Sequence, residues 1–411
     1  MIAANRFDTD VLIVGAGPTG LALATTLSRA GIRPIVVERL EAHQNTSRAA
    51  VIHAHTLEQL DGLGVSGPML QEGLRLTRFS VRDRDQVLAR LSFDWLPSRF
   101  ACLLMLPQDR TEAILANALE QAKTTVRWGC SLESLSVTDE GVEAIVSSAN
   151  GTQTLRARYV VGADGMHSRV RQAAGIGFSG HSYEQSFILA DVEMDWKPGR
   201  DEVMLFFSPE GLLVVAPLPG NAYRVVATVD DPPATPQASD VEKILRRRGP
   251  KSSGASVHAV RWSSRFRLHH RVADHYRRGR LLLVGDAAHV HSPAGGQGMN
   301  TGLVDACVLG KLLVQALSER APADPLDSYE ALRRPAAKEV LALAGRLTTA
   351  AIVKGRFRRS MRNLAFRLVG AVPPLRRRLE LSLSGLSRRA AAVLPVRQSR
   401  AAHAVPREAA L

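Results

Sequence analysis

Three short motifs that lie far apart in the chain combine glycines with acidic side chains. Glycine allows a tight backbone turn and a close approach to a ligand, and a carboxylate accepts hydrogen bonds from ribose hydroxyls. Each motif follows an apolar run that is typical of a buried strand. We therefore expect a site for one long ligand that several strand ends contact. The motifs read Gly15-Ala-Gly-Pro-Thr-Gly20, Gly162-Ala-Asp-Gly165 and Gly285-Asp-Ala-Ala-His289.

The first motif predicts a dinucleotide site. It ends a strand expected over residues 11–14 and opens a helix from Pro18, whose unpaired N–H groups and positive dipole end would meet a pyrophosphate. Glu38 ends the next strand, roughly 20 residues after Gly15, where its carboxylate can accept from a ribose. This motif alone fits either FAD or NAD(P). The residues assigned to it are Gly15, Gly17, Pro18, Thr19, Gly20, Glu38 and Arg39.

The other two motifs narrow the choice of dinucleotide. Asp164 and Asp286 follow strands expected over residues 158–161 and 280–284, and either Asp could instead cap a helix. A second glycine-rich loop, residues 293–302, then leads into an apolar helix over residues 303–317. That loop is too long for a pyrophosphate turn, and a nicotinamide dehydrogenase has no use for it at this distance.

Together the motifs resemble those of the single-component FAD-dependent aromatic hydroxylases, the family of p-hydroxybenzoate, phenol and polyketide hydroxylases. The resemblance covers about residues 8–345, with all motifs in order. It implies bound FAD, reduction by NAD(P)H, and reaction with O2 to a flavin C4a-hydroperoxide. That species would hydroxylate an electron-rich aromatic carbon. Water must be kept out of such a site.

The resemblance also assigns residues to the cofactor. It implies that Asp286 contacts the ribityl or pyrophosphate part of FAD and that Asp164 serves FAD and NAD(P)H together. Arg48 and Gln108 would contact the flavin side chain, although Arg48 could equally be a surface arginine. Many relatives have an arginine where this chain has His55, which leaves contacts from that segment open. Further cofactor contacts are implied for Gly165, Gly285, Pro293, Gly295, Gly296, Gly298, Met299 and Asn300.

The glycine loop is where we expect the chemistry. Backbone N–H groups over residues 296–299, with a helix dipole behind them, would stabilise negative charge on reduced flavin as an oxyanion hole does. Gln297 and Asn300 would add amide contacts, and His291 could reach the pocket, whereas His289 is expected to be structural. Arg110 and Glu112 are expected on a solvated helix face. The residues taken as catalytic are Pro293, Gly296, Gln297 and His291.

The substrate is expected to be lipophilic. Two apolar strands over residues 203–207 and 212–217 are the candidate pocket wall. We expect the contacts from Met204, Phe206, Leu213 and Val215, which suits a polycyclic or alkylated aromatic.

The order of elements predicts an α/β fold. A Rossmann-like FAD-binding domain with a parallel sheet would comprise residues 1–75, 100–180 and 275–345. A mixed β-sheet substrate domain, residues 76–99 and 181–274, would be inserted into it. A basic helical C-terminal extension would cover residues 346–411.

Composition constrains the partners. The three cysteines, Cys102, Cys130 and Cys307, lack metal-type spacing and suit a reducing, cytoplasmic compartment. No signal peptide or membrane-spanning run is evident. Much of the net charge of +14 lies in residues 354–411, yet no nucleic-acid-binding module accompanies it.

The basic tail has two interpretations. An apolar stripe, Val353, Phe357, Met361, Leu364 and Leu368, would either pack on the protein or contact anionic lipid. We expect packing, with membrane contact at the periphery as the alternative. The tail is too short for the thioredoxin-like dimer domain of larger phenol hydroxylases, so a monomer or a homodimer formed another way is expected.

Other functions remain open at this level. A flavin dehydrogenase, a desaturase or a non-catalytic FAD-binding protein would use the same scaffold. A halogenase is disfavoured because the Trp-x-Trp-x-Ile-Pro signature is absent and all four tryptophans are isolated.

Overall fold

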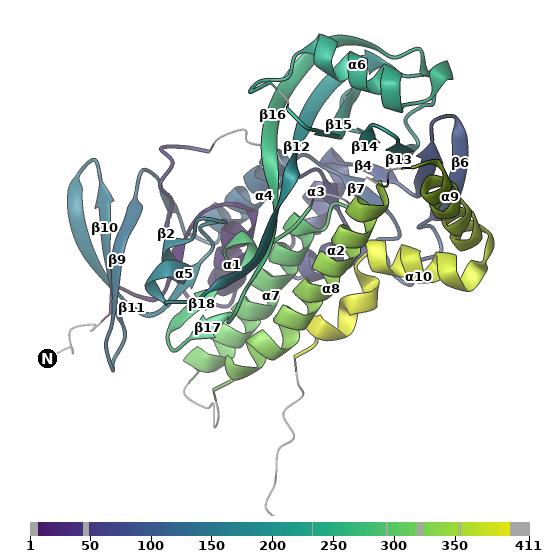
Figure 1. Cartoon of the computed structure of the whole chain (residues 1–411). Helices are drawn as coiled ribbons and strands as arrows, with labels where there is room; N and C mark the ends of the chain where they lie inside the picture. The colour runs from purple at the N-terminus through teal and green to yellow at the C-terminus, as the bar shows by residue number, and fades with distance from the viewer. Residues whose placement is uncertain are drawn as a thin grey trace, which may run out of the picture.

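Figure 1 shows the computed structural model of the chain, which describes residues 7–43, 49–231, 233–292, 295–318, 324–351, 353 and 355–394. Arg48 and Pro293 lie outside the described residues, so their predicted roles are not placed. The described chain contains two large sheets, with helices packed on them, and a small third sheet. The predicted α/β fold, with a parallel Rossmann-like sheet, a mixed second sheet and C-terminal helices, is confirmed.

The first sheet carries the three motifs. Its central strand β1 is buried because it is an uninterrupted apolar run, and it pairs in parallel with a strand on either side. A β-meander leads into the strand before Asp164. The strands are β1 (Thr9–Val14), β2 (Ile35–Val37), β8 (Val126–Arg127), β9 (Ser131–Val137), β10 (Val142–Ser148), β11 (Gly151–Gly162), β17 (Arg277–Arg278) and β18 (Leu281–Leu283).

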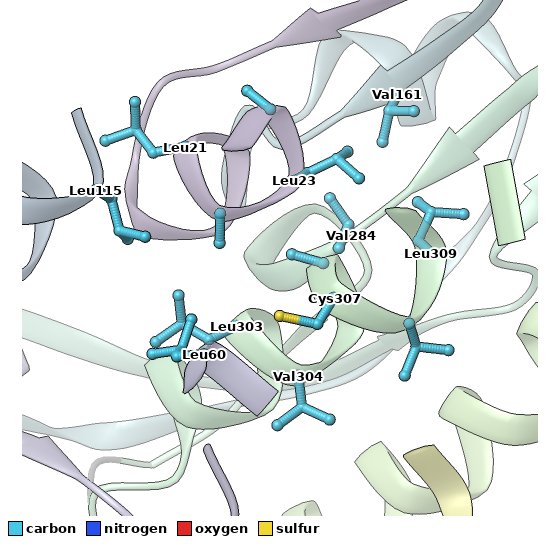
Figure 2. Close-up of a cluster of buried hydrophobic side chains, with 14 of the residues drawn as sticks. Leu21, Leu23, Leu60, Leu115, Val161, Val284, Leu303, Val304, Cys307 and Leu309 are labelled. Atoms are coloured by element: carbon cyan, nitrogen blue, oxygen red, sulfur yellow. The ribbon is translucent and has the colours of Figure 1, made fainter. Parts of the chain in front are cut away.

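Helices join this sheet in one apolar core. Figure 2 shows leucines of α1 (Pro18–Arg29) facing α7 (Gly298–Leu317), with Val161 and Val284 beside them. Among the described helices, α7 alone has the length and hydropathy of a membrane span, but most of it is buried in this core. The other helices around the sheet are α2 (Ala54–Asp61), α3 (Ser66–Glu72), α4 (Gln108–Gln121) and α5 (Arg169–Ala173).

The second sheet stands against the first and is covered on one face by α6 (Ala238–Arg248). Its two longest strands, β12 (Phe178–Asp195) and β16 (Ser256–Ala273), pair along most of their length. The remaining strands are β5 (Arg78–Asp83), β6 (Gln86–Ser92), β13 (Glu202–Ser208), β14 (Gly211–Pro217), β15 (Ala222–Val229) and β19 (His289–Val290). The third sheet consists of β3 (Val51–Ile52), β4 (Leu74–Leu76) and β7 (Leu103–Met105).

The C-terminal segment is helical, as the sequence predicts. After α8 (Asp327–Ala351) come α9 (Arg356–Ala371), α10 (Pro373–Leu383) and the short 3-10 helix η3 (Leu386–Ala392). Four of the five residues of the predicted stripe lie along one face of α9, whereas Val353 precedes this helix. For these four, the expectation that the stripe packs on the protein is wrong. Phe357, Met361, Leu364 and Leu368 are all more than half exposed.

Sheet membership supports the predicted domain division, whose boundaries stay a prediction. Strands of the first sheet come from residues 9–37, 126–162 and 277–283. Strands of the second come mainly from residues 78–92 and 178–273. The chain leaves the first sheet through α5 and β12, and it returns to that sheet through β16 and β17.

Candidate active site

A cavity of about 640 Å³ lies between the two large sheets. On one side it is lined by residues at the carboxyl ends of β1, β2 and β11, where ligands bind in open α/β sheets. On the other side it is lined by β13, β14 and β15 of the second sheet. All three glycine motifs therefore meet at one cavity, as the sequence predicts.

The three glycines of the first motif are required for different reasons. Gly15 has φ +105°, and a Cβ on it would lie 2.4 Å from the carbonyl oxygen of Ala163. A Cβ on Gly20 would lie 2.0 Å from the carbonyl oxygen of Gly15, so this glycine lets α1 pack closely on the turn. Gly17 lines the cavity, and a Cβ there would meet no atom within 4 Å. The space beside Gly17, at the N-terminus of α1, can hold a phosphate.

Glu38 stands at the end of β2 and lines the cavity. Its Oε2 accepts from the backbone N–H of Ala16 at 2.8 Å, and its Oε1 accepts from that of Leu40 at 3.1 Å. These bonds fix the carboxylate against the first motif. Pro18, Thr19 and Arg39 line the same part of the cavity.

Asp164 caps a helix with one carboxylate oxygen, while the other oxygen leaves room for the ligand contact that stays a prediction. Its Oδ2 accepts from the backbone N–H groups of Arg169 at 2.7 Å and Val170 at 3.3 Å, at the start of α5. Its Oδ1 is buried and has no hydrogen-bond partner within the described part of the chain. Burial raises the pKa of this carboxyl above its usual value. An unsatisfied buried acceptor that lines a cavity calls for a donor from a ligand. Gly165 lines the cavity beside it.

The third motif is held by a buried ionic cluster. Gly285 has φ +63° and packs against Thr19, while Asp286 lines the cavity. His289 has the expected structural role: its Nε2 lies 2.6 Å from Oδ2 of Asp305, whose Oδ1 accepts from Nε of Arg333 at 2.6 Å. This cluster ties the motif to α7 and α8.

The glycine loop reaches the cavity through Gly295, Gly296, Gly298 and Met299. A Cβ on Gly296, which has φ +62°, would lie 2.1 Å from Cγ1 of Val51. The loop is therefore pressed against β3, and it leads directly into the N-terminus of α7.

Asn300 holds the loop and is not part of the cavity lining. Its Nδ2 donates to the carbonyl oxygens of Val51 and Gly296, both at 2.8 Å, and its Oδ1 accepts from the N–H of His53 at 2.8 Å. The predicted amide contact to the cofactor is therefore replaced by three bonds to backbone groups. We infer a positioning role for Asn300.

Gln297 likewise turns away from the cavity. Its side chain is buried, with Nε2 donating to the carbonyl oxygen of Leu383 at 3.0 Å and Oε1 accepting from Nη2 of Arg388 at 2.9 Å. The prediction that Gln297 is a catalytic residue does not fit this orientation. Its partners lie 86 and 91 residues away in the chain, in the C-terminal extension, and nothing local in the sequence indicates them.

Two neutral histidines line the cavity. Nδ1 of His291 lies 2.8 Å from the carbonyl oxygen of Ser292. Its Nε2 is buried and has no hydrogen-bond partner within the described residues. Burial lowers the pKa of His291 to about 4 and that of His53 to about 3. With a proton on Nδ1, His291 presents Nε2 as an acceptor. The sequence did not indicate His53 as a site residue, although it immediately follows β3.

Gln108 and Glu112 form a second polar group on the lining. Gln108 accepts from the N–H of Ala49 at 3.2 Å and donates to Glu112 at 2.8 Å. Glu112 also lies 2.7 Å from Nε2 of His43, so the expectation that it is solvated is wrong. Arg110 is on the solvated face as expected and pairs with Glu72.

The substrate side of the cavity is apolar, but the residues predicted to contact the substrate face away from the cavity. Met204, Phe206, Leu213 and Val215 pack into the core beneath α6. The alternate positions of the same strands line the cavity: Val203, Leu205, Leu212, Val214 and Ala216.

Arg224 places one cation in this wall. It is buried and binds Asp191 through two bonds, of 2.7 and 2.8 Å. The aromatic rings of Phe79, Phe93 and Phe266 complete the apolar lining.

Two arginines and two histidines line the cavity near Asp164. His167, Arg169, Arg267 and His269 all belong to the lining. Burial, and then the charges of Arg271, His167 and Arg267, lower the pKa of His269. This part of the cavity attracts anionic ligands such as phosphates.

The arrangement fits FAD. The free space beside Gly17 suits a pyrophosphate, and Glu38 stands where a ribose binds. The unpartnered Oδ1 of Asp164 needs a donor, and the glycine loop allows a planar ring to approach the N-terminus of α7.

Comparisons with known proteins agree with this geometry. A family model described as an FAD binding domain matches residues 8–344. The chain is 35% identical over 342 residues to the pentachlorophenol 4-monooxygenase of Sphingobium chlorophenolicum, covering 81% of this chain and 63% of that protein. It is 37% identical over 343 residues to the 12-dehydrotetracycline 5-monooxygenase/anhydrotetracycline 6-monooxygenase of Streptomyces rimosus, covering 81% of this chain and 68% of that protein.

A solved structure extends the similarity to the C-terminal helices. The p-nitrophenol 4-monooxygenase PnpA of Pseudomonas putida superposes with a TM-score of 0.83 at 25% identity, over 93% of this chain and 98% of that chain. The matched segment spans about two thirds of the length of the curated relatives.

Proposed function

The chain belongs to the family of FAD-dependent aromatic monooxygenases, and we propose that it hydroxylates a lipophilic aromatic molecule with NAD(P)H and O2. The observation that carries the proposal is the single cavity, which joins the glycine motifs to the apolar face of β13 and β14. A cofactor at the motifs and a substrate at the sheet would therefore share one cavity. A phenolic, polyketide-like or quinol-like molecule suits this lining.

When bound, FAD would accept a hydride from NAD(P)H and would activate O2 so that one oxygen atom can be transferred. The protein's contribution is binding, orientation and exclusion of water. Gly15, Gly17 and Glu38 would hold the dinucleotide end of FAD, and Asp286 would also contribute to binding it. Backbone N–H groups at the start of α7 stabilise negative charge that develops beside them.

The apolar wall positions the substrate and excludes water. Val203, Leu205 and Val214 offer contact area without competing hydrogen bonds. Arg224 can donate to an oxygen of the substrate while Asp191 balances its charge. The neutral Nε2 of His291 can accept a hydrogen bond from a hydroxyl of the substrate.

NAD(P)H would approach at the arginines and histidines that line the cavity near Asp164. His167, Arg169 and Arg267 line that part of the cavity and suit the phosphates of the reductant. Asp164 then serves both nucleotides.

The cytoplasm is the compartment that we propose. NAD(P)H is available there, and the three cysteines are free and buried, as expected of a reducing compartment. A monomer or a homodimer stays the prediction for the oligomeric state.

The test is oxygen and NADPH consumption by FAD-loaded protein with candidate phenols, quinols and polycyclic aromatics. We expect slow NAD(P)H oxidation alone, stimulation by the correct aromatic, and one atom of isotopically labelled O2 in the product. Unlabelled product would indicate a dehydrogenase or desaturase. Bound FAD without any stimulated turnover would indicate a non-catalytic flavin-binding protein.

A further inference from the structure

An unusual apolar strip lies on the outside of the C-terminal helices. Among the described residues, ten large hydrophobic side chains are exposed, and six of these lie in α9, α10 and the residue between them. The spacing of the four on α9 places them on one face. The apolar strip comprises Phe357 (76% exposed), Met361 (57%), Leu364 (57%), Leu368 (53%), Val372 (37%) and Leu375 (47%).

The opposite face of α9 is fixed to the protein. Phe366 packs against Phe207, with ring centroids 5.0 Å apart, and Arg362 lies over the same ring at 4.8 Å. Asn363 donates to Asp83 at 2.7 Å. Figure 1 shows α9 beside β6 at the edge of the molecule, with α10 continuing along it. The helix is therefore anchored by its inner face, and its apolar outer face stays uncovered by the described chain.

The strip is flanked by positive charge. Arg358 lies on one flank of α9, and Arg356 and Arg367 lie on the other, all exposed. Arg377 and Arg378 extend the charge along α10.

The C-terminal helices themselves carry almost no acidic residues. Glu380 is the one acidic residue between residues 355 and 394. It is buried and accepts from the N–H of Ser92 at 2.9 Å and from Trp95 Nε1 at 2.6 Å.

We propose that the outer face of α9 and the start of α10 dock on an anionic lipid membrane. A helix with large apolar residues on one face and arginines on its flanks lies in the interface of a bilayer, where the arginines meet lipid phosphates. Charge complementarity selects this partner over a neutral apolar one. Docking would bring the enzyme to a membrane that concentrates lipophilic aromatics. The proposal for the helix face itself does not depend on the proposed activity.

The test is co-sedimentation of the FAD-loaded full chain with vesicles. Vesicles of phosphatidylglycerol mixed with phosphatidylcholine are compared with pure phosphatidylcholine, at low and high salt. We expect binding to the anionic vesicles that weakens with salt, since screening reduces the attraction of exposed arginines.

Two double variants, each with a matched control, separate the contribution of the apolar side chains to vesicle binding from that of the arginines. Phe357→Ser with Leu364→Ser should weaken vesicle binding roughly tenfold or more, because both side chains lose burial in lipid. The matched control replaces two exposed apolar residues of the β9–β10 hairpin, Val137→Ser with Ile145→Ser, and should bind like the parent.

The double variant that removes charge is Arg358→Gln with Arg367→Gln, and it should also weaken vesicle binding roughly tenfold or more. Its control is Arg33→Gln with Arg127→Gln, exposed arginines outside the C-terminal helices. FAD content and melting temperature should not change in any variant, because every replaced side chain is exposed or half exposed.

Three outcomes would overturn the proposal. One is no sedimentation with anionic vesicles at low salt. Another is equal binding by the strip variant and its hairpin control. The third is a dimer in solution that dissociates in the strip variant while vesicles are not bound, which would assign the strip to a second copy of this chain.

Discussion

At the residue scale, Gly17 is the sharpest test of cofactor binding. Its φ of −69° suits any residue, and a Cβ there meets open space, so Gly17→Val should fold with an unchanged melting temperature. The added side chain would nevertheless occupy the place of a pyrophosphate. We expect FAD affinity to fall by more than about tenfold, measured by titration of the apoprotein.

The control is Gly67→Val, another glycine at which a Cβ meets nothing within 4 Å but which lies outside the cavity. It should keep the parent's FAD affinity. Equal dissociation constants for the two valine variants would remove the first motif from the site. Gly15 is unsuitable for this test because its positive φ and its contact with Ala163 would disturb folding.

His291 also illustrates how burial decides function at this scale. A low pKa leaves its ring neutral near pH 7, so Nε2 can accept a hydrogen bond from a substrate hydroxyl, but the ring does not supply a positive charge.

At the scale of elements, β13 and β14 present one face to the cavity and the other to α6. Val214→Phe should alter the binding of bulky aromatics with little change in stability, because Val214 lines the cavity. Val215→Phe should lower the free energy of unfolding by about 1–3 kcal/mol, because it overpacks a closed core. Urea unfolding and the substrate-induced change in the flavin spectrum measure the two effects. Identical behaviour of both variants would contradict this assignment of faces.

The C-terminal extension holds the glycine loop through two bonds to Gln297, one to the carbonyl oxygen of Leu383 and one from Arg388. Arg388 is mostly buried, which lowers its pKa to about 10, and it donates to Gln297. Arg388→Met should cost about 1–3 kcal/mol of stability, because Oε1 of Gln297 then lacks its donor. We also expect weaker FAD binding and a shifted flavin absorbance spectrum, since the loop is held by this amide.

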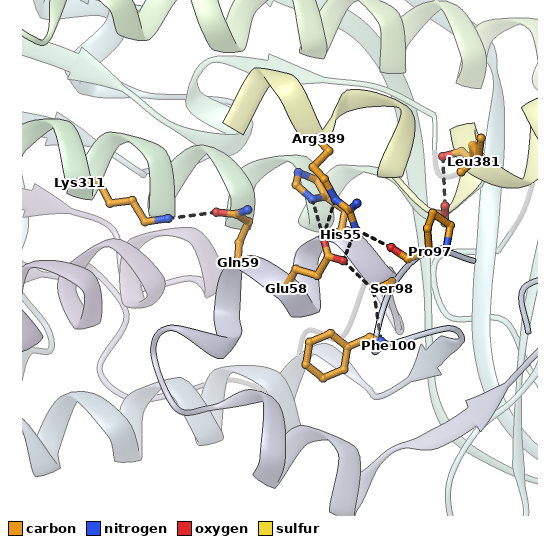
Figure 3. Close-up of polar contacts among 10 residues, drawn as sticks. His55, Glu58, Gln59, Pro97, Ser98, Phe100, Lys311, Leu381 and Arg389 are labelled. Atoms are coloured by element: carbon orange, nitrogen blue, oxygen red, sulfur yellow. Dashed lines mark hydrogen bonds and ion pairs between the residues drawn. The ribbon is translucent and has the colours of Figure 1, made fainter. Parts of the chain in front are cut away.

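The neighbouring arginine is the control for this prediction. Figure 3 shows Arg389 reaching Glu58 of α2 and the carbonyl oxygen of Pro97. This pair is partly exposed, so Arg389→Met should cost less than about 1 kcal/mol and leave FAD affinity unchanged. If Arg388→Met changed stability but neither FAD affinity nor the spectrum, the extension would serve folding alone.

At the scale of the whole molecule, the two buried histidines make stability depend on pH. His53 and His291 have folded pKa values of about 3 and about 4, below the 6.5 of the unfolded chain. As pH falls below 6.5 the unfolded state therefore binds protons first. Stability is lost from pH 6.5 down to about 4 for His291 and down to about 3 for His53. Each histidine should remove roughly 2 kcal/mol of unfolding free energy between pH 7 and 5.

Urea unfolding of FAD-saturated protein at a series of pH values measures this loss. The variant His53→Gln with His291→Gln should show a flatter dependence on pH. The exposed His258→Gln should keep the parent's dependence. A dependence that is the same in all three proteins would assign the acid sensitivity to other groups.

The sequence by itself determined the cofactor site and the architecture. One strand–turn–helix–strand unit contains Gly15, Gly17, Gly20 and Glu38. A short stretch of sequence determines such local geometry. The second and third motifs were identified for the same reason, since each follows its own strand. Their meeting at one cavity follows from the parallel sheet, whose carboxyl ends lie at a common edge.

Only the tertiary structure decided which side each functional side chain faces. Strands β13 and β14 are apolar over residues 203–207 and 212–217, so their sequence lacks the alternation that marks a buried face. The packing of α6 on one side of the sheet decides which face is buried. Gln297 turns toward Arg388 because a distant segment offers a buried donor. The stripe on α9 is the reverse case: its spacing revealed a helix face, but whether that face is covered depends on contacts that no local pattern encodes.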